Sequence, residues 1–206
     1  MDVSKAQQRR NRSPLKLLDV ILVVTEGRRT EVDYLVHVKS LLPRGAVRLC
    51  ILQSNANSPL RLKQHLQRAF RDALAVQGGT TGWVLLDRDF WDIRQIHALY
   101  AWSKSNPSVR IALSNPCFEV WLAYHFTDFP PTEKAKLHKL LTFERALLGT
   151  NKKGLNRAVF SIERIQAAVL RAQVRRGPLE MPSLRETDVH VLIAGLPLPQ
   201  NLPNTG

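Results

Sequence analysis

Short apolar runs alternate along the chain with segments in which apolar residues recur at helical spacing. The first run covers 20–24 and contains no polar alternation, which is typical of a strand buried on both faces of a parallel sheet. Further strand-like runs follow at 47–51, 83–86 and 109–113. Because right-handed crossovers join such strands, the order predicts an α/β fold with a mainly parallel four-stranded sheet flanked by helices.

A change of pattern divides the chain into an α/β core and a helical part. The core is predicted over 15–127, and Asp-Phe-Pro-Pro at 128–131 marks its end. A helical appendage is predicted over 128–196. A basic flexible arm is expected at 1–14, which includes three arginines, and a flexible tail at 197–206.

Acidic residues directly follow the first and third predicted strands. Glu26 precedes a glycine at the first strand end, and Asp87 and Asp89 follow the third. Open α/β sheets place ligands at the carboxyl ends of their strands, and side chains two residues apart on a strand share a face. We therefore expect the three carboxylates to converge, as hard oxygen ligands suited to Mg²⁺ or Mn²⁺. The structural alternative is that these acids occupy turns and helix caps.

Two further glutamates are secondary candidates for this site. Glu119 follows the fourth strand within an aromatic segment, where it either approaches the same edge of the sheet or forms a structural salt bridge. Glu31 lies in the first turn of a predicted helix, where it favours the helix dipole or faces the metal site. His125 is expected to be a buried, hydrogen-bonded histidine.

Three sequence blocks resemble a known family. They read Val-Val-Thr-Glu-Gly-Arg-Arg-Thr-Glu at 23–31, Leu-Asp-Arg-Asp-Phe at 86–90 and Ser-Asn-Pro-Cys-Phe-Glu-Val-Trp-Leu at 114–122. Together they are similar to RloB-like proteins, which are Toprim-type proteins often linked to restriction and phage-defence loci. The Glu-Gly and Asp-x-Asp pair also resembles the Toprim domains of overcoming-lysogenization-defect nucleases. A weaker resemblance to the same family at 182–190 is interrupted by Leu-Arg-Glu at 184–186.

The resemblance implies a Toprim-like fold and a metal-dependent nuclease. In that hypothesis Asp87 and Asp89 hold Mg²⁺ or Mn²⁺, and Glu26 completes the site or manages the proton of the attacking water. The candidate catalytic residues are Glu26, Asp87, Asp89 and Glu119, and the candidate metal ligands are Glu26, Glu31, Asp87 and Asp89. The alternative hypothesis is a non-catalytic nucleic-acid-binding subunit of a defence complex.

Charge supports a polyanionic partner, DNA or RNA. The 206 residues include 30 Lys and Arg against 17 Asp and Glu, a net charge of +13. Arg28, Arg29, Lys152 and Lys153 are the candidate nucleic-acid contacts. No apolar run approaches the roughly 20 residues of a membrane span, so we expect a cytoplasmic protein without membrane attachment. Other defence-system proteins are further candidate partners.

Overall fold

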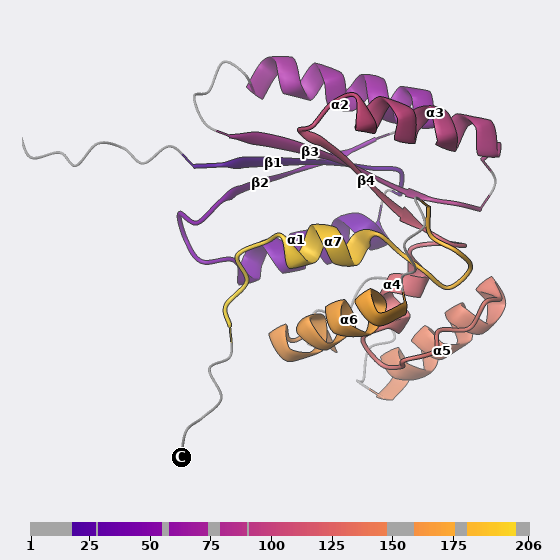
Figure 1. The fold of residues 1–206 in the computed structure, drawn as a ribbon. Helices are drawn as coiled ribbons and strands as arrows, with labels where there is room; N and C mark the ends of the chain where they lie inside the picture. The colour runs from indigo at the N-terminus through magenta and orange to yellow at the C-terminus, as the bar shows by residue number, and fades with distance from the viewer. Residues whose placement is uncertain are drawn as a thin grey trace, which may run out of the picture.

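The computed structural model describes residues 18–27, 29–54, 58–73, 79–89, 91–147, 159–175 and 181–200. Within these ranges a four-stranded sheet lies between two layers of helices (Figure 1). The predicted α/β fold is confirmed, and the arrangement is consistent with a Toprim-like fold. The arm predicted at 1–14, most of the predicted tail, Arg28, Lys152 and Lys153 lie outside the described residues.

The strands form one parallel sheet in the order β2-β1-β3-β4. Their bounds are β1 (Val20–Thr25), β2 (Arg48–Gln53), β3 (Thr80–Asp87) and β4 (Val109–Ser114). β1 and β3 occupy the centre, where both faces are covered, and their apolar runs have no polar alternation for that reason. The two acid-bearing strand ends are therefore neighbours, although 61 residues separate Glu26 from Asp87.

Helices cover both faces of the sheet. One face carries α2 (Pro59–Ala73) and α3 (Ile93–Lys104), which lie side by side (Figure 1). The other face carries α1 (Thr30–Leu41), α4 (Glu119–Ala123), α5 (Lys134–Leu147), α6 (Ile162–Arg175) and α7 (Val189–Ala194). Asp92 caps α3 by accepting a hydrogen bond from the backbone N–H of Arg94.

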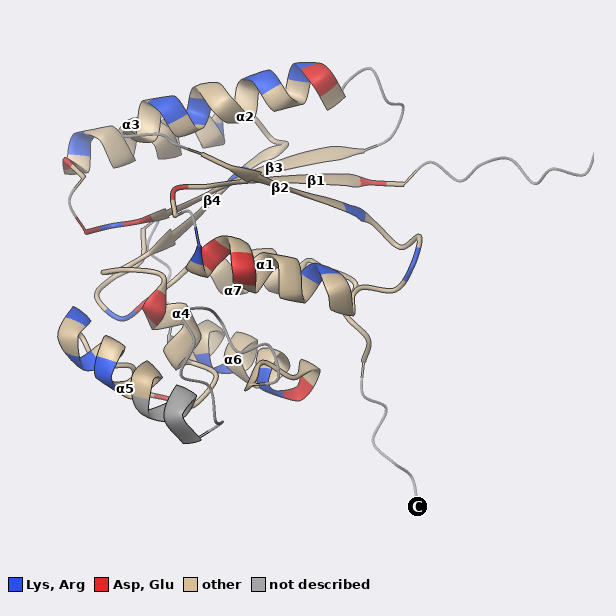
Figure 2. Cartoon of the chain, turned by 180° about the vertical axis from the view of Figure 1, so that it is seen from behind, with Lys and Arg blue, Asp and Glu red and all other residues tan. Residues whose placement is uncertain are grey.

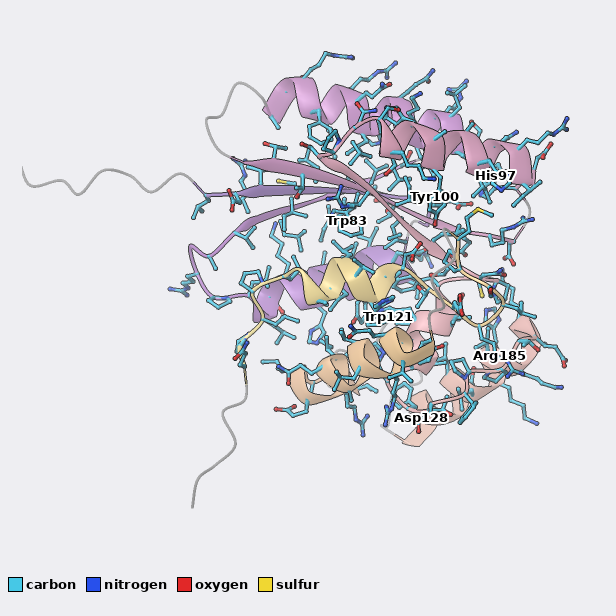
Figure 3. The ribbon with its side chains drawn as sticks, in the orientation of Figure 1. Trp83, His97, Tyr100, Trp121, Asp128 and Arg185 are labelled. Carbon is cyan, nitrogen blue, oxygen red and sulfur yellow. The ribbon has the colours of Figure 1, made fainter. Side chains whose placement is uncertain are left out.

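Alternation along the strands sorts the apolar side chains into two cores. Val84 and Leu86 of β3 face α2 and α3, where they pack with Leu62 and Leu66. Trp83 and Leu85 face the opposite layer (Figure 3). Position 87 continues this second series, so Asp87 is directed toward the layer that contains α1 and α4.

The C-terminal helices share the core of the α1 face. Buried residues of α5, α6 and α7, including Leu137, Ile165 and Leu192, belong to the same apolar cluster as Val23 and Leu85 of the sheet. On this face of the sheet α7 contacts β4 and α1 contacts β2. Whether 128–196 folds as a separate appendage stays a prediction.

The segment before α7 attaches to the end of β4. Thr187 forms an antiparallel bridge with Ser114, and their hydroxyls lie 2.8 Å apart. The backbone N–H of Asn115 donates to the Glu186 carbonyl at 3.0 Å. Tyr100 extends from α3 on the other face and donates to Asp188 at 2.7 Å (Figure 3). The C-terminal segment thereby fixes the loop that follows β4.

A buried aromatic cluster joins α1 to α4 and contains His125, as the sequence predicted for this residue. The Tyr34 hydroxyl lies 3.1 Å from His125 Nε2, and His125 Nδ1 lies 3.1 Å from the Trp121 carbonyl. Because a carbonyl only accepts, Nδ1 carries the proton and Nε2 accepts from Tyr34. Burial lowers the pKa of His125 to about 3, so the ring is neutral in the folded protein.

We expect His125 to make the protein less stable in acid. Below pH 6.5 the unfolded chain binds a proton that the folded His125 refuses, so stability falls as the pH drops from 6.5 toward 3. The difference in unfolding free energy between the parent and His125→Asn should therefore shrink by up to roughly 1.4 kcal/mol per pH unit below that value. Urea unfolding across this pH range measures it. A constant difference contradicts the prediction, and the exposed His97→Asn serves as control.

Candidate functional site

The carboxylates that follow β1 and β3 meet at the carboxyl edge of the sheet. Figure 2 shows the acidic segments at these strand ends, at the start of α1 and at α4 on one side of the molecule. Asp87 ends β3, and its backbone N–H donates to Glu26 Oε2 at 3.2 Å. This hydrogen bond joins the two strand ends through a carboxylate.

Glu26 is oriented by an indole as well as by this backbone donor. Trp91 Nε1 lies 3.1 Å from both Glu26 oxygens and donates to them. Arg88 holds the intervening loop closed by donating from Nη1 to the Trp91 carbonyl at 2.8 Å. Burial raises the pKa of Glu26, and the charge of Asp89 adds to this, while the Trp91 and Asp87 donors oppose it.

Asp89 lies beyond the end of β3 and forms an ion pair with Lys134 at the start of α5. Strand alternation therefore does not determine its direction. The backbone N–H groups of Arg88 and Asp89 both donate to the Pro116 carbonyl at 3.1 Å, which fixes the loop against the segment after β4. The Asn115–Pro116 peptide bond is cis. Lys134 places a positive charge beside these carboxylates.

Glu119 begins α4 and lies at the same edge. Asp87 Oδ1 accepts the backbone N–H of Phe118 at 2.8 Å, so the third family block is bonded directly to the second. Glu119 Oε1 lies 3.3 Å from His138 Nε2 of α5. The negative charge of Glu119 raises the pKa of both Asp87 and Glu31, which places it within electrostatic reach of the strand-end acids.

Glu31 occupies the space above Gly27. A Cβ atom added to Gly27 would lie only 1.9 Å from Glu31 Oε2, so a larger residue here would force the Glu31 side chain to move. Burial raises the pKa of Glu31, and the charges of Glu119 and Glu26 raise it further.

Asp87 is the electrostatic centre of this carboxylate cluster, which comprises Glu26, Glu31, Asp87, Asp89 and Glu119. Burial raises the pKa of Asp87 well above its usual value, and the charges of Glu31, Glu119, Glu26 and Asp89 add to the shift in that order. The other four sequence-predicted acids thus all lie within electrostatic reach of Asp87. Such a cluster favours either a retained proton or an added cation.

The present arrangement of the carboxylate cluster limits its ability to bind a metal ion. Among the described residues, no group of three His, Cys, Asp or Glu side chains has the arrangement needed to bind a metal ion together. The carboxylates are instead directed at protein donors from Trp91, Phe118 and Lys134.

Arg29, a candidate nucleic-acid contact, is exposed immediately before α1.

Sequence reasoning missed three residues that shape this site. Trp91 lies next to the Asp-x-Asp block, and a nearby indole N–H was an available signal. Lys134 and His138 come from α5, which is distant in sequence and carries no motif that assigns it to the strand ends. Only the packing of α5 against α4 brings these basic groups to Asp89 and Glu119.

Within the described segments, no helix combines the length and the apolar character needed to cross a bilayer.

Comparison with known proteins identifies one family. The family model described as RloB-like protein matches residues 21–196, which is most of the chain and includes all five acids of the carboxylate cluster. No curated protein and no solved structure matches the chain.

We expect Asp87→Asn to stabilise the protein at neutral pH in metal-free buffer. Because the folded pKa is raised, a charged Asp87 destabilises the folded state increasingly as the pH rises above its usual value of 3.8. The gain should be roughly 1.4 kcal/mol for each unit by which the folded pKa exceeds the unfolded one. It should vanish well below pH 3.8, where both states hold the proton. Asparagine keeps an oxygen that accepts the Phe118 N–H.

Urea denaturation of the parent and variant from acid to neutral pH measures this gain. The exposed Asp72→Asn on α2 is the matched control and should change little. If Asp87 is only a structural cap, its replacement should instead destabilise the protein by about 0.5–2 kcal/mol, which would contradict the prediction.

Proposed function

Because the chain belongs to the family of RloB-like proteins, we propose that it is a metal-dependent nuclease that cleaves phosphodiester bonds of nucleic acid in phage defence. One observation carries this proposal: burial, together with four neighbouring carboxylates, raises the pKa of Asp87 at the carboxyl edge of a parallel sheet. A fold rarely retains so much buried like charge unless the site has a function.

The donor chemistry of the cluster fits Mg²⁺ or Mn²⁺. Asp87 and Asp89 would hold the ion together with Glu26 or Glu31, since hard cations prefer carboxylate oxygens. The buried charge around Asp87 is the kind that an added cation relieves. When bound, the metal supplies positive charge that stabilises the negative charge developing on a scissile phosphate.

The chain's own residues supply orientation and proton handling. Trp91 and the Asp87 backbone hold Glu26 by its oxygens, so this carboxylate is fixed before substrate arrives. Its raised pKa suits a group that accepts a proton from attacking water. The backbone N–H of Phe118 fixes the Asp87 side chain in the same way. The next residue, Glu119, pairs with His138.

Basic segments surround the acidic edge and support nucleic acid as the substrate class. Figure 2 shows Lys and Arg on α5 close to the carboxylate cluster and further along α2 and α3. The net charge of +13 favours any polyanion. Lys134 lies at the cluster itself, where displacement from Asp89 would free its ammonium group for a phosphate.

The alternative function is a non-catalytic nucleic-acid-binding subunit of a defence complex. Its specific support is that Glu26, Asp87 and Asp89 already bond to protein donors. If protein donors already satisfy these carboxylates, the site needs no metal ion. Other defence proteins would then supply the chemistry.

Digestion of single- and double-stranded DNA and RNA, with and without Mg²⁺ or Mn²⁺, tests the proposal. We expect metal-dependent cleavage by the parent and its loss in Asp87→Asn, with an effect of at least roughly 100-fold, as for other groups that stabilise developing charge. Binding of nucleic acid should survive the substitution. Asp72→Asn again serves as control because it changes the same charge far from the cluster. Cleavage that persists in Asp87→Asn, or binding without any cleavage, would contradict the nuclease.

We expect Lys134→Gln to strengthen metal binding, because Lys134 competes with a cation for Asp89. Removing this partly exposed pair should lower metal-free stability by no more than about 1 kcal/mol. Added Mn²⁺ should then raise the melting temperature of Lys134→Gln at lower concentration than that of the parent. Thermal melts across a Mn²⁺ titration measure both effects. Lys136→Gln, which removes the neighbouring pair with Glu133, should behave like the parent. Weaker Mn²⁺ binding by Lys134→Gln would count against competition.

A further inference from the structure

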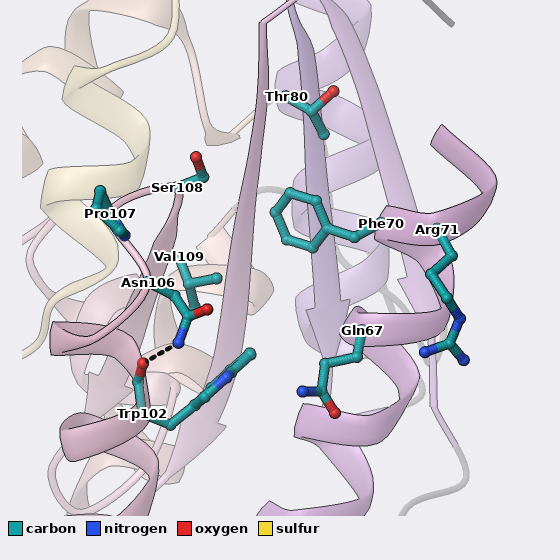
Figure 4. A pocket seen from close by; sticks show the side chains of 9 residues that line it. All are labelled: Gln67, Phe70, Arg71, Thr80, Trp102, Asn106, Pro107, Ser108 and Val109. Atoms are coloured by element: carbon teal, nitrogen blue, oxygen red, sulfur yellow. Dashed lines mark hydrogen bonds between the residues drawn. The ribbon is translucent and has the colours of Figure 1, made fainter. Parts of the chain in front are cut away.

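A pocket of about 520 Å³ lies at the end of the sheet opposite to the carboxylate cluster. It opens between the last turns of α2 and α3, next to the first residues of β3 and β4 (Figure 4). Its volume falls within the roughly 300–1,000 Å³ of small-molecule sites. The lining residues are Gln67, Phe70, Arg71, Thr80, Trp102, Asn106, Pro107, Ser108 and Val109.

The lining combines aromatic surface, neutral hydrogen-bonding groups and one positive charge. Phe70 and Trp102 come from different helices and stand on opposite sides of the open space (Figure 4). Gln67 and Asn106 add amides, and Arg71 adds a guanidinium. No acidic residue is among the described residues that line the pocket. A planar aromatic ligand with polar edges and a negative charge matches this set.

Both aromatic side chains contact residues that do not line the pocket. Phe70 packs over Gly82 of β3, where an added Cβ would lie 2.4 Å from its ring. Lys63 lies 5.2 Å from the centre of the Trp102 ring and forms a cation–π contact. Asn106 donates from Nδ2 to the Trp102 carbonyl at 2.6 Å (Figure 4). This hydrogen bond uses one amide N–H of Asn106 and orients the Asn106 side chain.

We propose that this pocket binds a nucleoside monophosphate group, with its base against Phe70 and Trp102 and its phosphate near Arg71. Bases stack on aromatic side chains regardless of sequence, while amide groups bond to base edges. The group belongs either to a free nucleotide or to an unpaired residue of a single strand. Arg68, Arg61 and Lys63 extend the positive charge along α2 beyond the pocket.

The pocket is separate from the proposed nuclease site. Thr80 begins β3 and Asp87 ends it, so seven residues of extended strand, about 23 Å, lie between the two sites. A base held by Trp102 is therefore not at the carboxylates. The inference does not depend on cleavage or on a metal, and its failure and that of the proposed nuclease are distinguishable.

Calorimetric titration with AMP and with GMP in buffer containing a chelator tests the proposal. We expect saturable binding by the parent and by Asp87→Asn alike, because neither a metal nor the carboxylate cluster takes part. In nitrogen-labelled protein the indole N–H resonance of Trp102 should shift, whereas that of the buried Trp121 should not. Absence of mononucleotide binding, or binding that needs Mg²⁺ and is lost in Asp87→Asn, overturns the proposal.

Substitutions in the pocket locate the ligand. Trp102→Ala should weaken binding by roughly 5- to 150-fold and Trp102→Phe by less, because phenylalanine retains a stacking surface. Phe129→Ala removes an exposed aromatic on the other layer and should have no effect. Since Trp102 is half-buried, Arg71→Gln gives a second variant at an exposed position, matched by Arg61→Gln on the same helix. Equal losses in these two arginine variants would show unspecific charge attraction and overturn the pocket assignment.

A comparison of nucleotide sources completes the test. A short single-stranded oligonucleotide and the matching duplex are titrated beside AMP, again without divalent cations. Tighter binding of the single strand, lost in Trp102→Ala, identifies an unpaired residue of a strand as the ligand. Equal or tighter binding of AMP identifies a free nucleotide. Duplex binding that is indifferent to Trp102→Ala and to Arg71→Gln, with no AMP binding, overturns the proposal.

Discussion

The pleat of β3 is the constraint on which the candidate site depends. Trp83 and Leu85 are buried on the α1 face of the sheet, and a period of two places Asp87 on that same face at the strand end. A shift of register by one residue would move both apolar side chains into the layer of α2 and α3 and would direct Asp87 toward those helices as well. The apolar packing that stabilises the sheet therefore also aims the carboxylate, and core and site are not independent.

Holding five carboxylates at one edge is unfavourable, and the fold offsets this with donors that are mostly neutral. Trp91, the Asp87 backbone and the Phe118 backbone each bond to an acidic side chain, while Lys134 and His138 of α5 contact the outer acids. Neutral donors fix direction without cancelling charge. Compensation by basic side chains is therefore confined to the rim, where the partners are more exposed.

Sequence patterns predicted the fold well because each strand of the sheet is a local apolar run. They also predicted the strand-end acids, since Glu26 and Asp87 lie at boundaries that periodicity detects. The contribution of α5 was out of reach, because no local signal directs Lys134 toward Asp89. The close approach of the Glu31 carboxylate to Gly27 was also out of reach. Such close approaches depend on side-chain packing rather than on pattern.

The two ends of the sheet carry opposite chemistry, and both follow from one architecture. Parallel strands all end at the same edge, so acids that follow β1 and β3 necessarily meet there. At the other edge α2 and α3 finish beside the starts of β3 and β4, where Phe70 and Trp102 leave an aromatic pocket on a basic helix layer. A polyanion is repelled by the first edge unless a cation intervenes, and attracted by the second. The same parallel architecture therefore separates an anion-attracting pocket from a cation-requiring edge by the length of β3.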